Sequence, residues 1–216
     1  MPNWHYFTLF SLLMACSSPQ PRPLTLTTLN DFHGALYELP TRDKEVVAGG
    51  LPWLAGLLDV WRSEGKPMLL LDGGDIFQGS WTVNASQGMA AVEAYNLLQV
   101  DAAAVGNHEF DYGGLEGKHP LRGALERAGA AAEWKWLSAN IYDAKNNTPW
   151  TPKGFAPSTI LEKGGVKIGV IGLSTTDTPE TTLKKNVADL NFVDVVPVVK
   201  HLSEALRHKG VDLIAV

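Results

Sequence analysis

Short apolar runs that resemble strands alternate with longer runs of helical spacing throughout residues 24–216. Leucine and threonine alternate over residues 24–29, which is the pattern of a strand with one buried face. Leu54, Leu58 and Trp61 recur every three or four residues and so share one face of a helix. A chain that alternates strand and helix in this way is predicted to form a layered α/β domain with much parallel strand pairing.

The same two patterns predict the other elements of this domain. We expect strands over residues 68–71, 102–105, 136–141, 166–171 and 211–216, and helices over residues 89–98, 124–132 and 195–210. The 216 residues suffice for one domain with a sizeable core. Because the sequence stops inside an apolar strand, with no turn or polar cap after it, we expect it to be part of a longer protein.

The overall charge argues against one class of partner. The formal net charge is −5, whereas a protein that grips long nucleic acid needs a positive surface. A content of 45% hydrophobic and 19% charged residues is typical of a soluble globular protein. A small phosphate-bearing substrate remains possible, because bound metal ions can supply positive charge locally.

Residues 1–16 have the pattern of an export signal. Their apolar run is too short for a membrane-spanning helix. The run ends in Leu-Met-Ala-Cys, which resembles a bacterial lipobox in which Cys16 becomes the lipidated first residue. The Ser- and Pro-rich residues 17–23 then read as a tether. We therefore expect an exported protein on the periplasmic side of the cell envelope, anchored to the membrane through Cys16. Another kind of export signal and a plain apolar N-terminus remain alternatives.

Three polar clusters directly follow three of the predicted strands. They comprise residues 30–34, 72–80 and 106–113. Ligands of open α/β sheets bind at the edge where the carboxyl ends of the strands lie. We therefore expect the three clusters to converge there, although they are far apart in the sequence.

The residue types in these clusters suit divalent metal ions. Asp31 and His33 are two residues apart, so in an extended segment both side chains point to the same side and can bind one ion. Asp75 follows two glycines that permit a sharp turn, and its carboxylate can bridge two ions. Asn107 offers an amide oxygen to the second ion. Oxygen and nitrogen ligands without a thiolate favour Mn, Fe, Zn, Mg or Co.

Two further residues of the third cluster suit proton transfer rather than metal binding. His108 is next to Asn107 and can stabilise developing negative charge or protonate a leaving alkoxide. Asp111 is three residues further on and can orient the imidazole and keep it charged. Two ions together with this pair would allow an activated hydroxide to attack a phosphorus atom in line with the leaving group.

The clusters resemble the first three motifs of the calcineurin-like metallophosphoesterase superfamily. The matching segments are Asp31-x-His33, Gly74-Asp75-x-x-Gln78-Gly79-Ser80 and the Gly-Asn-His-Glu-Phe-Asp-Tyr-Gly run that starts at Gly106. The third segment, together with Asn-Asp-Phe-His-Gly from Asn30, is similar to the branch that contains 5′-nucleotidases and 2′,3′-cyclic-nucleotide phosphodiesterases.

The resemblance implies an αββα sandwich that holds two divalent ions. It implies that Asp31 and His33 bind the first ion, that Asp75 bridges both and that Asn107 binds the second. It also implies that His108 and Asp111 form a catalytic pair that acts on a nucleotide. Family members carry further Ser-His and Gly-His-x-His motifs later in the chain, which this sequence lacks. We therefore expect residues 24–216 to be the N-terminal part of the catalytic domain, incomplete at its C-terminus.

Several other functions stay open at this point. The same site could serve a 2′,3′-cyclic-nucleotide phosphodiesterase or a nucleotide-sugar hydrolase. A non-catalytic solute- or metal-binding lipoprotein fragment is an alternative of another class, in which the polar residues serve as turn and capping groups. A dinucleotide-binding domain is disfavoured, because the Gly169-Val170-Ile171-Gly172 segment lacks the required glycine spacing.

Overall fold

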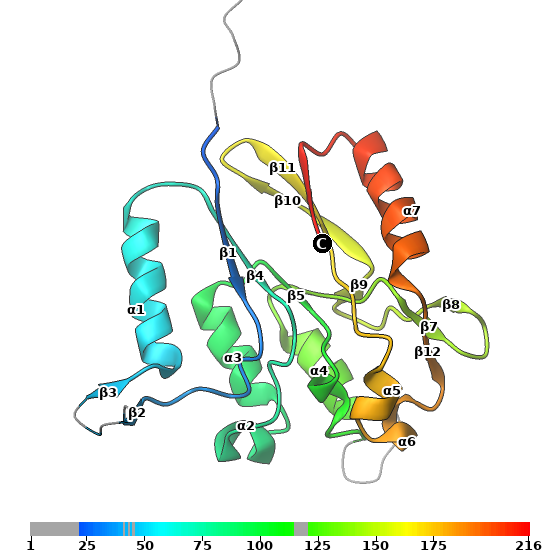
Figure 1. Ribbon diagram of the computed structural model, residues 1–216, viewed down its shortest axis with the longest axis horizontal. Coiled ribbons are helices and arrows are strands. Elements are labelled where there is room, and N and C mark those ends of the chain that lie inside the picture. The colour runs from blue at the N-terminus through cyan, green and yellow to red at the C-terminus, as the bar shows by residue number, and fades with distance from the viewer. Residues whose placement is uncertain (1–21, 41, 43, 45, 115–120) are drawn as a thin grey trace, which may run out of the picture.

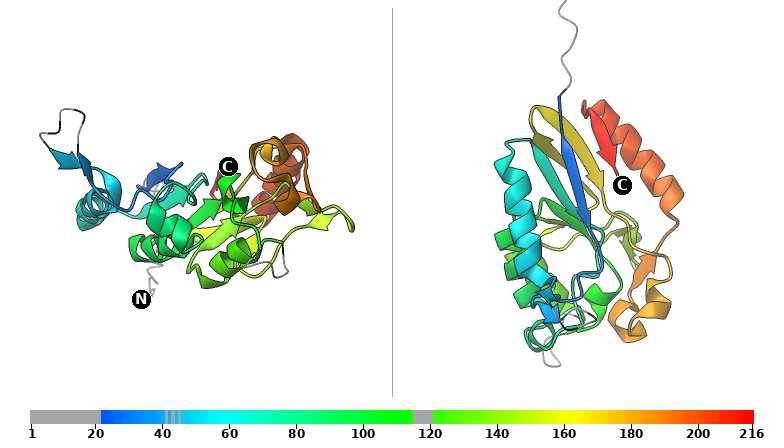
Figure 2. Two further views of the ribbon diagram at one scale, coloured as in Figure 1. Left: turned by 90° about the horizontal axis from the view of Figure 1, so that it is seen from below. Right: turned by 60° about the vertical axis from the view of Figure 1, so that its left-hand side comes forward.

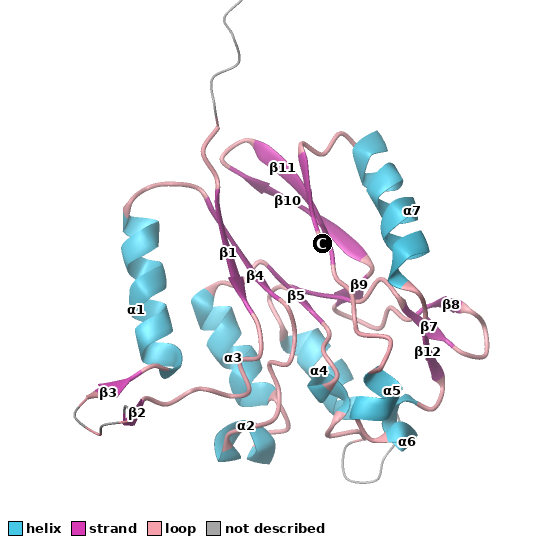
Figure 3. Ribbon diagram, in the orientation of Figure 1, coloured by secondary structure: helices cyan, strands magenta, loops and turns pink. Residues whose placement is uncertain are grey.

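The protein forms a four-layered α/β structure, seen in a computed structural model that describes residues 22–40, 42, 44, 46–114 and 121–216 (Figures 1 and 3). The predicted signal with Cys16 and most of the predicted tether are outside these residues. The elements are β1 (Thr25–Leu29), β2 (Leu39–Pro40), β3 (Val47–Ala48), α1 (Gly50–Ser63), β4 (Met68–Asp72), α2 (Trp81–Ala85), α3 (Met89–Leu98), β5 (Ala102–Ala104), the 3₁₀ helix η1 (His108–Phe110), α4 (Gly123–Ala131), β6 (Lys135–Leu137), β7 (Ile141–Asp143), β8 (Thr148–Pro149), β9 (Phe155–Ala156), β10 (Ser158–Lys163), β11 (Val166–Ile171), α5 (Thr178–Thr181), α6 (Lys184–Val187), β12 (Leu190–Phe192), α7 (Val195–His208) and β13 (Leu213–Ala215).

The first sheet is parallel throughout and has the strand order β1-β4-β5-β6-β9. Helices α1, α3 and α4 cover one of its faces (Figure 1). Leu58 of α1 and Leu125 of α4 are fully buried against this face, together with Leu70 and Trp136 from the strands. The predicted parallel α/β architecture is therefore confirmed.

The second sheet has the order β10-β11-β13 and lies against the other face of the first sheet (Figure 2). Leu69 and Leu137 of the first sheet pack there against Ile168 and Val170 of β11. On the outer face of the second sheet, Leu206 of α7 packs with Ile171. The layers are thus helices, sheet, sheet and helix, which confirms the αββα expectation.

Side chains alternate between the two cores along the strands of the first sheet. In β6, Trp136 faces the helices while Leu137 faces the second sheet. In β5, Ala103 and Ala102 divide in the same way. This period of two is what a strand buried on both faces requires, and it fixes the register that places the following loops.

One predicted strand is wrong. Residues 136–141 do not form a single strand but contribute to β6 and β7, which belong to different sheets. The chain turns between them at buried polar residues. The amide nitrogen of Asn140 donates to the carbonyls of Ser174 and Val193, at 2.9 and 3.1 Å, so this side chain holds the two neighbouring segments at the break.

The other predicted elements are present, with ends shifted by a few residues at most. The pattern did not predict β10, which pairs antiparallel with β11, nor the very short strands. Within the described part of the chain, no helix has the length and hydropathy that crossing a membrane demands.

Candidate metal centre

The loops after β1, β4 and β5 meet at one edge of the first sheet, because these three strands are neighbours and run parallel. Backbone hydrogen bonds join the first loop to the second. The N–H of Asp31 donates to Gly74 O at 3.1 Å, and the N–H of His33 donates to Asp75 O at 3.0 Å. The predicted convergence of the polar clusters is therefore confirmed for these two loops by direct contact.

Three of the polar residues have backbone conformations that are rare for residues other than glycine. The φ angles of Asp31, His33 and Asp75 are 52°, 47° and 57°. The expectation of an extended Asp31-x-His33 segment is therefore wrong. The turn nevertheless brings the two side chains together, since Asp31 Oδ1 lies 3.8 Å from His33 Nε2. Such strained residues gather at functional sites.

Glycine allows the loops to approach this closely. A Cβ atom on Gly106 would lie 2.2 Å from Asp75 Oδ1, and a Cβ atom on Gly79 would lie 2.1 Å from His33 O. Neither contact is sterically possible, so the third and second loops can hold Asp75 and His33 in place only with glycine at these positions.

His33, Asp75 and His108 each bring one potential ligand atom within 4.8 Å of the other two. One residue comes from each of the three loops. The other ring nitrogen of His33, Nδ1, lies 3.2 Å from Phe77 O, the kind of contact that fixes the tautomer of a metal-binding histidine. The group is half-buried and contains only oxygen and nitrogen donors, so His33 and Asp75 fit a divalent ion such as Mn or Zn, with His108 directly beside them.

Asp31 and Asn107 flank this trio. Asp31 lies beside His33, and its side chain is 57% exposed. The amide nitrogen of Asn107 donates to Thr181 O at 3.3 Å. Since that nitrogen is occupied, the oxygen of the Asn107 amide is the atom left for a cation.

His108 and Asp111 form a close pair. Nδ1 of His108 lies 2.6 Å from Asp111 Oδ2, and the backbone N–H of His108 donates to Asp75 Oδ1 at 3.0 Å. Burial lowers the pKa of His108, but the hydrogen bond to Asp111 and the negative charges of Asp111, Asp75 and Glu109 outweigh this and raise the pKa above its ordinary value. The pair is therefore suited to hold a proton on the imidazole.

The buried side chain of Glu109 connects the second and third loops through hydrogen bonds. Its side chain is fully buried and accepts hydrogen bonds from the backbone N–H groups of Asp75, Ile76, Phe77 and Gly106, at 2.7 to 3.0 Å. Burial raises the pKa of Glu109 to about 7, against the opposing effect of these hydrogen bonds. One carboxylate thus fixes the backbone on both sides of the Asp75 side chain.

Asp72 supports the same loop from the end of β4. It accepts from the Gly74 N–H at 2.7 Å and from the hydroxyl of Tyr95 at 2.8 Å. Burial raises the pKa of Asp72 to about 6. Asp72 and Glu109 thus both hold the backbone of the second loop from buried positions.

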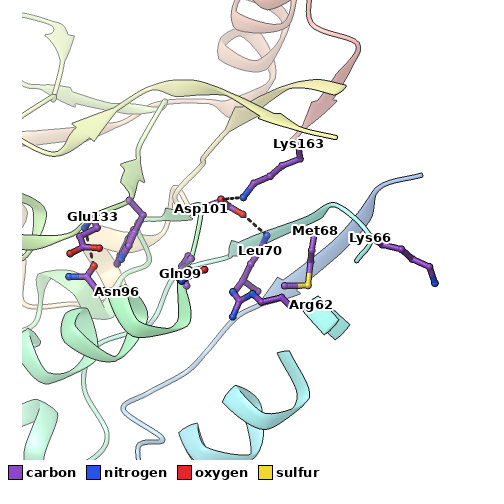
Figure 4. A pocket seen from close by; sticks show the side chains of 11 residues that line it. Arg62, Lys66, Met68, Leu70, Asn96, Gln99, Asp101, Glu133 and Lys163 are labelled. Atoms are coloured by element: carbon purple, nitrogen blue, oxygen red, sulfur yellow. Dashed lines mark hydrogen bonds and ion pairs between the residues drawn. The ribbon is translucent and has the colours of Figure 1, made fainter. Parts of the chain in front are cut away.

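A cavity of about 440 Å³ lies at the opposite edge of the first sheet, at the amino ends of β4, β5 and β6 (Figure 4). Two groups bind the carboxylate of Asp101 there: the ammonium of Lys163 at 2.6 Å and the N–H of Leu70 at 2.9 Å. The cavity and its charged lining are therefore separate from the cluster of His33, Asp75 and His108.

Sequence reasoning missed the residues that hold the third loop from outside. The hydroxyl of Thr182 donates to Asp111 Oδ1 at 2.9 Å, and the amide nitrogen of Asn186 donates to Phe110 O at 2.7 Å. Neither residue belongs to a motif, and more than 70 positions separate each from its partner. No local signal in the sequence identifies such contacts.

Comparison with known proteins gives consistent relatives. The family model described as calcineurin-like phosphoesterase matches residues 24–215. A 5′-nucleotidase of Diplobatis ommata is 32% identical over 214 residues, covering 95% of this chain and 35% of that protein. Cell wall protein Lmo0130 of Listeria monocytogenes is 29% identical over 213 residues, covering 90% of this chain and 27% of that protein.

Solved structures resemble the fold as well. The crystal structure of the 5′-nucleotidase precursor from Thermus thermophilus superimposes with a TM-score of 0.76 and 33% identity, covering 88% of this chain and 36% of that chain. The present chain thus spans about a third of the length of these relatives.

Proposed function

This chain belongs to the calcineurin-like phosphoesterase family, and on that premise we propose that it takes part in removing phosphate from nucleotides as a metal-dependent hydrolase. The observation that carries the proposal is the convergence of His33, Asp75 and His108 from three loops. The 5′-nucleotidases of Diplobatis ommata and Thermus thermophilus support the substrate class.

We propose that Asp31, His33, Asp75 and Asn107 would hold two divalent ions. When bound, the ions would supply positive charge against the phosphoryl oxygens and lower the pKa of a water nucleophile. The strained loop conformations and the carboxylate of Glu109 keep these side chains in place before any ligand arrives. Such preorganisation reduces the reorganisation that the reaction would otherwise require.

His108 is proposed to act on the leaving group. Its Nδ1 is engaged by Asp111, so Nε2 is the nitrogen available to a substrate oxygen. With its pKa raised, the imidazole holds a proton that it can donate to the departing alkoxide of the nucleoside. Asp111 orients the ring and stabilises its charged form.

The first experiment measures Mn²⁺ binding by titration calorimetry and phosphate release from AMP, both with the protein as its own cell makes it. Asp75→Ala is expected to abolish both, because it removes the central carboxylate. Asp59→Ala is the matched control, since Asp59 is an exposed carboxylate on α1. Equal Mn²⁺ affinity in the wild type and Asp75→Ala would contradict the metal site. Phosphate release that changes neither with added Mn²⁺ nor in Asp75→Ala would contradict the proposed metal-dependent hydrolase activity.

Substrate class is tested on the same samples. A preference for AMP over 2′,3′-cyclic AMP and a nucleotide sugar is expected for a 5′-nucleotidase. The reverse order would favour one of the other two ester types on the same residues.

We also propose that residues 1–16 direct export and that Cys16 carries a lipid anchor, with residues 17–23 as the tether. The cell wall protein of Listeria monocytogenes supports a location in the cell envelope. Labelling with a fatty-acid analogue in a bacterial host should mark the wild type and not Cys16→Ser. Equal labelling of both would contradict the anchor.

A further inference from the structure

The segment that follows β11, residues 174–186, forms hydrogen bonds with the third loop, residues 105–111, at several points. The hydroxyl of Ser174 donates to Val105 O, and Thr181 O accepts from the amide of Asn107. Thr182 and Asn186 hold the far end of the same loop, at Asp111 and Phe110 respectively. The loop that carries Asn107, His108 and Asp111 is thus held by residues far from it in the sequence.

Among these contacts, the hydrogen bond of Thr182 is the one that reaches the side chains of the proposed catalytic pair, His108 and Asp111. Asp111 has two carboxylate oxygens, of which Oδ2 lies 2.6 Å from His108 Nδ1 and Oδ1 accepts from Thr182 Oγ1 at 2.9 Å. A carboxylate held at one oxygen by His108 alone can rotate about its bond to Cβ. A second bond at the other oxygen removes that freedom and fixes the direction in which the imidazole points.

Thr182 itself is held in place by its surroundings. It is the C-cap residue directly after α5, and its N–H donates to Thr178 O at 3.1 Å. Four residues later in the chain, Asn186 is buried, and its main-chain oxygen accepts from the guanidinium of Arg122 at 3.0 Å. The Thr182 hydroxyl is therefore presented to Asp111 from a fixed backbone and not from a free loop.

We infer that Thr182 is a positioning residue, whose hydroxyl orients the carboxylate of Asp111 and, through it, the imidazole of His108. The predicted effect of Thr182 on turnover rests on the proposed function, whereas its effect on the orientation of Asp111 does not. The three residues then form a chain of hydrogen bonds in the order Thr182, Asp111, His108. The Thr182 hydroxyl contacts Asp111, so its effect on the reacting atoms would pass through the pair.

The test uses substitutions that separate the hydroxyl from the shape of the side chain. Thr182→Val keeps the shape and removes the hydroxyl, whereas Thr182→Ser keeps the hydroxyl. Thr182→Ala is a second hydroxyl-free variant in case valine disturbs the fold. Thr175→Val is the matched control, because the Thr175 hydroxyl only accepts from the N–H of Asp177 in its own turn.

The first readout is kcat/KM for phosphate release with two leaving groups. Thr182→Val should lower the value for AMP about tenfold, in line with the loss of a residue that orients a catalytic group. The loss with p-nitrophenyl phosphate should be clearly smaller, because its leaving group needs little protonation. Thr182→Ser and Thr175→Val should stay within about twofold of the wild type for both substrates. If Thr182 only stabilised the fold, Thr182→Val would lower kcat/KM for both substrates by the same factor.

The second readout needs no turnover. In ¹H–¹⁵N spectra of histidine-labelled protein at one fixed pH, the Nδ1 signal of His108 is assigned with His108→Asn. Thr182→Val should move that signal towards its position in Asp111→Asn, and Thr182→Ser should not.

An unchanged Nδ1 signal in both hydroxyl-free variants would overturn the inference, as would equal losses for the two leaving groups. A wild-type chain that releases no phosphate would count against the proposed function instead. The imidazole spectra would then decide the role of Thr182 by themselves.

Discussion

Single residues at the candidate metal centre combine side chains suited to metal binding with unfavourable backbone conformations. Positive φ at a residue other than glycine costs on the order of 1 kcal/mol or more, and Asp31, His33 and Asp75 all have it. Hydrogen bonds between the first two loops compensate for part of this cost, and the carboxylate of Glu109 holds the second loop to the third. The geometry of the proposed ligands therefore depends on residues outside the proposed ligand set.

Replacing Glu109 by glutamine should weaken metal binding without unfolding the protein. Glutamine keeps the volume, but its amide nitrogen cannot accept a hydrogen bond, so either the N–H groups of Asp75 and Gly106 or those of Ile76 and Phe77 lose their acceptor. Loss of such a supporting contact lowers metal affinity by about 10- to 100-fold. Titration calorimetry with Mn²⁺ measures the change.

Asp101→Asn is the control for that measurement. Asp101 is also a carboxylate that accepts a backbone N–H of the first sheet, but it lies at the opposite edge. Its substitution should leave Mn²⁺ affinity within about twofold of the wild type. A folded Glu109→Gln variant with wild-type affinity would show that the loops do not need this carboxylate.

At the scale of elements, the sequence predicted what is periodic or locally encoded. Helices α1, α3 and α7 and strand β11 have enough apolar residues to show their period. The ligand clusters were also predictable, because Asp, His and Asn follow strands whose carboxyl ends share one edge. Strands of two residues such as β8 and β9 are too short to show a period. The role of Thr182 arises only from tertiary contact, so no local pattern reveals it.

Two elements distant in sequence are joined by an ion pair next to the third loop. Arg122, at the start of α4, is 7% exposed and donates to both carboxylate oxygens of Asp189, at 2.6 and 3.0 Å. Its guanidinium also lies 5.4 Å from the ring centre of Trp150. The hydrogen bond to Arg122 lowers the pKa of Asp189 below its ordinary value.

The free energy of unfolding should therefore depend on Asp189 in a pH-sensitive way. A lowered folded-state pKa contributes stability above the unfolded-state pKa of about 4, and this contribution is lost as the pH falls through the folded-state pKa. Asp189→Asn should cost about 1 kcal/mol at pH 7, a modest value because Asp189 is half exposed. The difference from the wild type should shrink below about pH 4.

Urea denaturation at a series of pH values tests this dependence. Glu180→Gln serves as the control, because its pair with Lys184 is exposed on both sides and should contribute almost nothing. A constant difference between wild type and Asp189→Asn down to about pH 3 would exclude the ionised pair as its source.

For the whole molecule, cohesion depends on the apolar layer between the two sheets. That layer is thin: Leu69, Ala102 and Leu137 on one side meet Ile168 and Val170 on the other. The ion pair of Lys163 with Asp101 adds a polar link between the sheets at the amino-end edge of the first sheet (Figure 4). The second sheet thereby covers a face of the first sheet that would otherwise be exposed apolar surface.

Substituting a residue of that layer should destabilise the molecule far more than substituting its neighbour in the same sheet. Ile168 of β11 is fully buried, whereas Ile160 of the adjacent β10 is 39% exposed. Ile168→Ala should lower the free energy of unfolding by about 2 to 4 kcal/mol. Ile160→Ala should cost about 1 kcal/mol or less, and urea denaturation compares the two. Similar losses would mean that the sheets do not pack as described.

The parallel order of β1, β4 and β5 has a consequence for folding kinetics. Each parallel pair forms only after an intervening crossover has been closed, and such non-local pairing is slow. The three loops meet at the ends of these strands, so we expect the candidate metal centre to be among the last parts of the chain to become native. Ions bound there would slow unfolding and leave the refolding rate almost unchanged. Stopped-flow refolding that accelerates with Mn²⁺ would show that the centre forms early instead.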